Sequence, residues 1–228
     1  MTDLVFYTNP QSRGQIARWM LEEVGASYET VWLDYGTSMK GADYLAINPM
    51  GKVPAIRHGD IVVTEGAAIC AYLADAFSDA GLAPAPSDPQ RGAYYRWLFF
   101  GAGPVETAVT NTYLKWEPTA EQQPMVGYGT YAQVLDVLQD LVASAGPFLL
   151  GDWFSAVDVY LGSQIIWGTQ FGTMERRPGF EDYVARVTER PAYRKAKAID
   201  TAACPSRSSS NERRNPEPRD RALRSVHA

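Results

Sequence analysis

The chain contains 228 residues, of which 46% are hydrophobic and 21% are charged, and its formal net charge is -5. This composition is typical of a soluble globular protein with one large domain or two small ones. The mild acidity gives no general attraction to nucleic acid or to an anionic membrane, so we expect neither as a partner. Two cysteines and two histidines are too few for a disulfide framework, a histidine-rich metal site or a serine–histidine–aspartate triad. No stretch approaches the roughly 18 apolar residues of a membrane span, and no signal peptide is evident, so we expect a cytoplasmic protein without a metal.

Residues 1–77 predict an alternation of strands and helices. The apolar run Leu4–Tyr7 is typical of a buried strand. After Ser12, apolar side chains recur at helical spacing as far as Val24, and Gly25 then suits a helix C-cap. Further expected elements are strands over Tyr28–Leu33, Ala55–Arg57 and Ile61–Val63, a polar loop at Asp34–Met39, and a helix over Glu65–Ala76. This order predicts a small mixed sheet covered by helices.

The rest of the chain predicts helices followed by a polar tail. A segment rich in proline and serine at 78–90 is expected to be a linker between two domains. Residues 91–203 are expected to form an all-helical domain, with amphipathic patterns that begin at Arg91 and Tyr131. Residues 204–228 contain six arginines, three acidic residues and almost no large apolar side chains, so we expect a disordered tail.

Ser155 and Asp158 form a capping-box pattern at the start of one of these helices. In this motif the serine accepts a hydrogen bond from the first helical turn, and the acidic side chain reaches back to the serine amide. We therefore expect Asp158 to be structural and not catalytic.

Three local patterns converge on one kind of site. In the sequence NPMGKVP at 48–54, either a trans proline at a strand start or a cis Val53–Pro54 bond would fit. Glu65, followed by small residues at a helix start, could hold an ammonium group beside amides that attract a carboxylate, or could simply favour the helix dipole. Ser12 could cap the first helix or donate a hydrogen bond to an anion. Without a histidine partner Ser12 is not expected to be a nucleophile, but it could stabilise the thiolate of another molecule.

The order of these motifs resembles that of cytosolic glutathione transferases, in particular the bacterial enzymes. The resemblance spans residues 4 to about 200 and rests on FYTNPQSRGQIARWMLEEVG, NPMGKVPAI, TEGAAICAYLAD and LLGDWFSAVDVYLG. It implies a thioredoxin-like α/β N-terminal domain, an all-α C-terminal domain, and a homodimer with its active sites between the domains.

The resemblance also implies roles for individual residues. Pro54 would be the family's cis-proline, Val53 would pair with the cysteinyl backbone of glutathione, and Lys52 would lie near the glycyl carboxylate. Glu65 and the amide of Gly66 would bind the γ-glutamyl end. Many family members have serine at the position of Gly66, and loss of that hydroxyl would weaken glutathione binding by roughly 1.5–3 kcal/mol if nothing replaced it.

Two residues are candidates for activating the glutathione thiol. The bacterial beta class has a cysteine near the start of the first helix and a histidine in the helical domain, whereas this chain has Ser12 and no histidine at 91–203. Ser12 is similar to the serine of the theta and zeta classes, and its place at a helix start favours a thiolate. Tyr7 is the competing candidate, because other classes use a tyrosine at the end of the first strand.

The sequence thus predicts an enzyme that conjugates glutathione, its co-substrate, to small hydrophobic electrophiles. The alternatives are glutathione-dependent dehalogenation, isomerisation or peroxide reduction at the same site, and a non-catalytic binding or regulatory protein of the same fold. We expect the electrophile to lie between the Tyr7–Gln11 loop and some of the aromatic side chains Tyr95, Phe99, Phe100, Tyr113 and Trp116.

Overall fold

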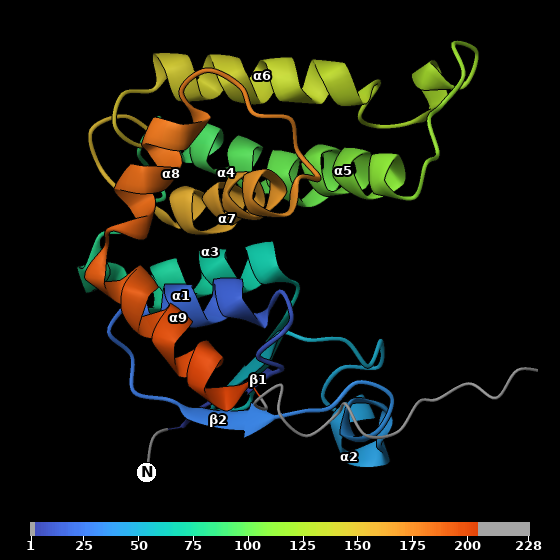
Figure 1. Cartoon of the computed structure of the whole chain (residues 1–228). Coiled ribbons are helices and arrows are strands. Elements are labelled where there is room, and N and C mark those ends of the chain that lie inside the picture. The colour runs from blue at the N-terminus through green and yellow to red at the C-terminus, as the bar shows by residue number, and fades with distance from the viewer. Residues whose placement is uncertain (1–2, 205–228) are drawn as a thin grey trace, which may run out of the picture.

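The computed structural model describes residues 3–204 of the chain. Figure 1 shows an α/β half that contains the strands, and a helical half stacked against it. This arrangement confirms the predicted fold class, an α/β domain of the thioredoxin-like type combined with an all-helical part.

Four short strands form one mixed sheet: β1 (Leu4–Thr8), β2 (Glu29–Trp32), β3 (Ala55–His58) and β4 (Ile61–Thr64). Their order is β2-β1-β3-β4, with β1 parallel to β2 and antiparallel to β3, and β3 antiparallel to β4. The parallel pair requires a crossover, and α1 (Gly14–Glu23) supplies it by burying Ile16, Trp19 and Met20. Gly25 follows the helix with a left-handed φ of 65°, as its predicted role as a C-cap requires.

The chain between β2 and β3 forms a 3-10 turn at Ser38–Lys40 and the short helix α2 (Ala42–Leu45). The sequence pattern predicted only a polar loop here, because an element of one turn has no detectable periodicity. Met39 and Tyr44 are buried in this segment and pack with Leu33 and Ala55 in a small cluster of their own. The cluster positions the segment that leads into β3.

The helical half is built around one buried helix. Its members are α4 (Arg91–Phe100), α5 (Glu106–Tyr113), α6 (Tyr131–Ser144), α7 (Ala156–Phe171) and α8 (Phe180–Thr188). Helix α7 is buried along most of its length and contacts α4 and α8 as well as α1 and α3 (Gly66–Ala76) of the α/β half. A π-helical stretch at Gly101–Val105 joins α4 to α5 and contains Pro104, which has no amide hydrogen to donate.

The predicted capping box at the start of α7 is confirmed. Ser155 Oγ accepts a hydrogen bond from the Val157 amide at 3.2 Å, and Asp158 Oδ2 accepts one from the Ser155 amide at 2.9 Å. Asp158 is fully buried inside the helical half, which agrees with a structural role.

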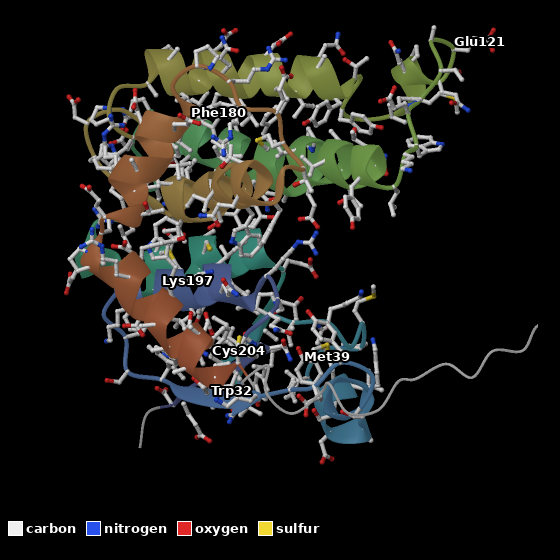
Figure 2. All side chains as sticks on the ribbon, viewed as in Figure 1. Trp32, Met39, Glu121, Phe180, Lys197 and Cys204 are labelled. Atoms are coloured by element: carbon white, nitrogen blue, oxygen red, sulfur yellow. The ribbon has the colours of Figure 1, made fainter. Side chains whose placement is uncertain are left out.

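The last helix, α9 (Pro191–Ala203), returns to the α/β half and packs against α1. Figure 2 shows Lys197 on this helix and Cys204 directly after its end, both beside the α/β half. Ion pairs hold it there, among them Arg190 to Glu23 at 2.7 Å and Lys195 to Glu22 at 2.6 Å. The tail predicted at 204–228 lies, apart from Cys204, outside the described residues. Between residues 3 and 204 no helix combines the length and the apolar character that crossing a bilayer demands.

Candidate active site

A cavity of about 330 Å³ lies between the α/β half and the helical half, and we call it the inner cavity. Its walls come from Arg13 and Ile16 on α1, the segment before β3, the start of α3, and Ala102, Glu106 and Tyr160 of the helical half. The five residues predicted to bind glutathione all line it: Lys52, Val53, Pro54, Glu65 and Gly66. The tertiary structure thus brings together two motifs that are separate in the sequence.

Two side chains hold the segment at Lys52–Pro54 in place. The Val53–Pro54 peptide bond is cis, so the structure selects one of the two alternatives that the sequence left open. The Lys52 carbonyl accepts hydrogen bonds from the Tyr44 hydroxyl and from Asn48 Nδ2, the latter at 2.8 Å. Burial raises the pKa of Tyr44 to about 12, so its hydroxyl remains a donor at neutral pH. Sequence reasoning assigned no role to Tyr44 or Asn48, although Asn48 opens the motif.

Glu65 occupies an unusual backbone position at the start of α3. Its φ of 67° is left-handed, a conformation that costs a residue other than glycine about 1–3 kcal/mol and that is concentrated at functional sites. Because Glu65 is the N-cap, the amide of Gly66 is among those that have no partner within the helix. A carboxylate therefore lies beside a helix N-terminus that attracts anions, which suits a ligand group carrying both an ammonium and a carboxylate.

The ring of Tyr160 explains why position 66 is a glycine. A Cβ atom at Gly66 would lie 3.1 Å from Cε2 of Tyr160, and a Cβ at Gly101 would lie 3.1 Å from Cε1 of the same ring. The ring therefore fits between two glycines and cannot move away from one without approaching the other. A serine at position 66 would press on this ring, and Tyr160 itself lines the inner cavity at this point.

Substituting Gly66 with alanine is expected to lower the free energy of unfolding by about 1–3 kcal/mol, because the added methyl group overpacks the Tyr160 ring. Urea denaturation followed by circular dichroism measures the change. The matched control is Gly92→Ala near the start of α4, where a Cβ would meet nothing within 4 Å and helix propensity favours alanine. Equal stability of the Gly66 variant and the parent would contradict this interpretation.

The two candidates for activating the thiol lie in different surroundings. The Ser12 hydroxyl donates a hydrogen bond to the Asn9 carbonyl at 2.7 Å and accepts one from the Gly14 amide at 2.9 Å. Its donor is thus used within the turn that precedes α1. Tyr7 packs in the small cluster beside Tyr44, with ring centroids 5.6 Å apart, and is in the walls of neither cavity described here.

A second cavity of about 530 Å³, the outer cavity, begins where the inner one ends. Both are lined by Arg13. Ser12 and Gln11 line the outer cavity, as expected of the loop before α1, and the apolar part of its wall comes from Val109, Trp167 and Phe171.

None of the aromatic side chains expected beside the electrophile lines either of these two cavities in their described walls: Tyr95, Phe99, Phe100, Tyr113 and Trp116. Helix α4 buries Tyr94, Trp97 and Leu98, and helical periodicity then turns Phe99 outward, where it is 71% exposed. Sequence reasoning did not predict the apolar side chains that line the outer cavity. Two of them, Trp167 and Phe171, lie on α7, whose sequence indicates only a buried helix.

An ion pair crosses the inner cavity from one half of the protein to the other. Arg13 Nη2 lies 2.8 Å from Glu106 Oε1, and the Tyr160 hydroxyl lies 3.5 Å from Glu106 Oε2. These residues were not predicted, and the only signal was the place of Arg13 next to Ser12. Across residues 3–204, no group of three or more histidine, cysteine or acidic side chains is placed to hold a metal ion.

Comparison with known proteins adds four findings. Residues 12–76 match the family described as glutathione S-transferase, N-terminal domain. Glutathione S-transferase A of Pleuronectes platessa is 28% identical over 162 residues, which cover 68% of this chain and 72% of that protein. A glutathione transferase structure from Methylococcus capsulatus is 29% identical with a TM-score of 0.71, covering 87% of this chain and 99% of that one. A sphingomonad glutathione S-transferase complexed with glutathione is 26% identical with a TM-score of 0.70, covering 86% and 98%.

The fold and the cavity define a class of two-part proteins, in which a thioredoxin-like α/β domain and an all-helical domain enclose a polar site between them. The matches in sequence and structure are to glutathione S-transferases. Residues 12–76 match the N-terminal domain of that family, and the chain as a whole is similar to its members.

Proposed function

We propose that this chain is a glutathione transferase that conjugates the glutathione thiolate to small hydrophobic electrophiles. The observation that carries the proposal is the gathering of Lys52, Val53, Pro54, Glu65 and Gly66 in the inner cavity. The adjoining outer cavity supports a hydrophobic electrophile as the second substrate, because its apolar side chains would bury the surface of a flat hydrophobic molecule away from water.

In the proposed complex each charged group of glutathione has a complementary partner, either an oppositely charged side chain or a hydrogen-bond donor. Glu65 binds the γ-glutamyl ammonium, and the Gly66 amide at the start of α3 binds the γ-glutamyl carboxylate. The backbone of Val53 pairs with the cysteinyl residue, and the Lys52 ammonium lies near the glycyl carboxylate. This orientation directs the cysteinyl sulfur toward the start of α1.

Ser12 is proposed to donate a hydrogen bond to the thiolate, which requires its hydroxyl to turn away from the Asn9 carbonyl. A serine in this role makes the protein beta/theta-like, with serine in place of the beta-class cysteine. Tyr7 remains the second candidate for the same role.

Other glutathione-dependent reactions at the same site are the alternative: dehalogenation, isomerisation and peroxide reduction. A mechanism through a mixed disulfide is disfavoured by the positions of the cysteines in the described chain, since Cys70 is buried in the core and Cys204 follows the end of α9. A non-catalytic binding protein would keep the inner cavity and lack turnover.

The experiment that tests the proposal measures glutathione binding by calorimetry and turnover with chlorodinitrobenzene. We expect the parent to show both, Ser12→Ala to lower kcat about 10- to 100-fold through loss of one hydrogen bond to the thiolate, and Tyr7→Phe to stay within about twofold. A dead Tyr7→Phe with an unimpaired Ser12→Ala would transfer the role to Tyr7. If the parent neither binds glutathione nor turns over, the transferase proposal fails.

A homodimer and a cytoplasmic location complete the proposal. Exposed apolar side chains on the edge strand β4, Ile61 and Val62, together with Phe99 on α4, support a contact between subunits.

A further inference from the structure

Arg13 lines both cavities, and none of the binding or catalytic roles proposed above involves its positive charge. We infer that Arg13 is a further catalytic residue, whose guanidinium stabilises the glutathione thiolate and lowers the pKa of the bound thiol. The inference rests on the proposed function, because it presupposes glutathione in the inner cavity.

Its position singles out Arg13. The sulfur of a conjugating enzyme must face the peptide's own site on one side and the electrophile on the other, so it lies where the two cavities meet. Among the described residues that line the inner and outer cavities, Arg13 is the only one common to both. Ser12 lines the outer cavity alone, and its hydroxyl hydrogen is directed to the Asn9 carbonyl.

Both the backbone and the guanidinium of Arg13 have partners that hold the residue at this junction. Its backbone is the N-cap of α1, where its carbonyl accepts a hydrogen bond from the Ile16 amide at 3.1 Å. Its Nη2 atom is bound by Glu106 at 2.8 Å. A guanidinium has five N–H donors, and the side chain is 53% exposed, so donors remain for a ligand atom in the cavity.

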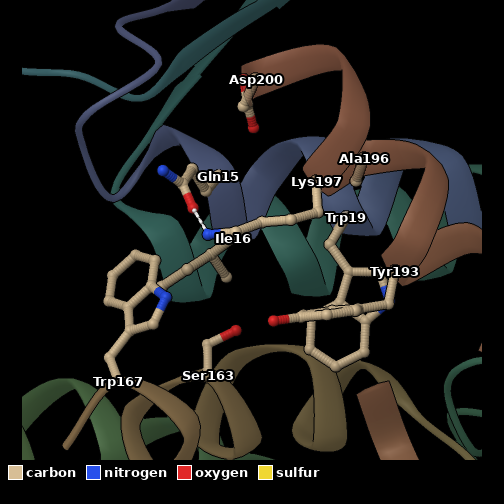
Figure 3. A pocket seen from close by; sticks show the side chains of 9 residues that line it. All are labelled: Gln15, Ile16, Trp19, Ser163, Trp167, Tyr193, Ala196, Lys197 and Asp200. Atoms are coloured by element: carbon tan, nitrogen blue, oxygen red, sulfur yellow. Dashed lines mark hydrogen bonds between the residues drawn. The ribbon is translucent and has the colours of Figure 1, made fainter. Parts of the chain in front are cut away.

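The other charged side chains that line the two cavities already have partners or proposed roles, so none of them is assigned to the thiolate in place of Arg13. Glu65 and Lys52 are assigned to the charged ends of glutathione, and Glu106 is the ion-pair partner of Arg13. Lys197 lines the outer cavity and donates a hydrogen bond to Gln15 Oε1 at 2.9 Å, as Figure 3 shows. The remaining titratable side chains of these walls are Tyr35 in the outer cavity and Tyr160 in the inner one.

The pKa of the bound thiol provides a test that does not depend on turnover. The ultraviolet absorbance of the thiolate is followed against pH in protein saturated with glutathione. Removing Arg13 alone would also leave Glu106 unpaired, so the decisive comparison is between Glu106→Gln and the double variant Arg13→Gln/Glu106→Gln, which differ by one positive charge. We expect the double variant to have a thiol pKa about one unit higher, which is tenfold less thiolate below that pKa.

Matched controls separate a specific contact from the general field of the site. Lys197→Gln also removes one cation from the outer cavity, and we expect it to shift the thiol pKa by no more than about 0.3 units. Arg13→Lys keeps the charge and should retain a lower thiol pKa than Arg13→Gln. Equal thiol pKa values in Glu106→Gln and the double variant, with glutathione bound to both, would overturn the role of Arg13. Failure of the parent to bind glutathione would instead overturn the proposed function, and this inference with it.

Discussion

Substitution of Asp158 with alanine is expected to lower the free energy of unfolding by about 3–5 kcal/mol, a large share of the roughly 5–15 kcal/mol by which a folded protein is ordinarily stable. The carboxylate is 0% exposed. Its Oδ1 accepts hydrogen bonds from the Leu149 amide at 2.9 Å and the Tyr183 hydroxyl at 3.0 Å, and its Oδ2 accepts from the amide and the hydroxyl of Ser155. Alanine leaves these donors buried without their acceptor, which costs free energy because water cannot replace it there. Urea unfolding followed by circular dichroism measures the loss.

The second capping box of the protein is the matched control. Thr130 and Gln133 form the same motif at the start of α6, but in an exposed position. Thr130→Ala should cost only about 1 kcal/mol, because water replaces the lost partner. If the two substitutions cost the same, the buried network around Asp158 contributes nothing beyond ordinary capping.

The pH dependence of the stability difference between the parent and Asp158→Ala gives a second measurement. Burial raises the pKa of Asp158 to about 6, although hydrogen bonds from the Leu149 and Ser155 amides oppose the shift. The folded chain therefore binds more protons than the unfolded chain between the ordinary pKa of 3.8 and about 6, and this group favours folding less as the pH rises through that window. The stability difference between the parent and Asp158→Ala should accordingly be larger at the acidic end of the window than above it.

Substitution of Asp200 with alanine is expected to cost about 3–5 kcal/mol, because it leaves the buried guanidinium of Arg18 without a counterion. Arg18 and Asp200 are 1% and 2% exposed, and Arg18 Nε lies 2.7 Å from Asp200 Oδ1. The guanidinium also lies over the rings of Phe6 and Trp32, at 4.9 and 4.7 Å from their centroids. Figure 3 shows Asp200 beside Lys197 on α9, where α1 and α7 complete the walls of a small cavity. The pair therefore holds the last helix on the α/β half.

The double variant Arg18→Met/Asp200→Ala distinguishes a buried charge from lost packing. Removing both charges should recover at least about 1 kcal/mol relative to Asp200→Ala, since a methionine carries no charge that needs a buried counterion. Unfolding midpoints in urea compare the two variants. If the double variant is the less stable of the two, the cost of Asp200→Ala does not come from an unpaired charge.

Local patterns were sufficient for much of this protein. Strand β1, helix α1 with Gly25 after it, helix α3 and the Ser155 capping box follow from hydrophobic periodicity and from residues with fixed backbone preferences. Such signals act over a few residues, so they survive in the sequence. Two short motifs, Lys52–Pro54 and Glu65–Gly66, likewise indicated a site before its geometry was known.

The tertiary structure decided what depends on residues distant in the chain. Tyr160 occupies the space beside Gly66, Glu106 pairs with Arg13, and α9 packs against α1, because buried faces must find partners of matching shape and charge. No periodicity records those choices. The sequence could name residues that the structure brings together in the inner cavity. Only the packing of α7 against α1, together with the ion pair from Glu106 of α5, decided which cation lies where the two cavities meet and which apolar side chains face it.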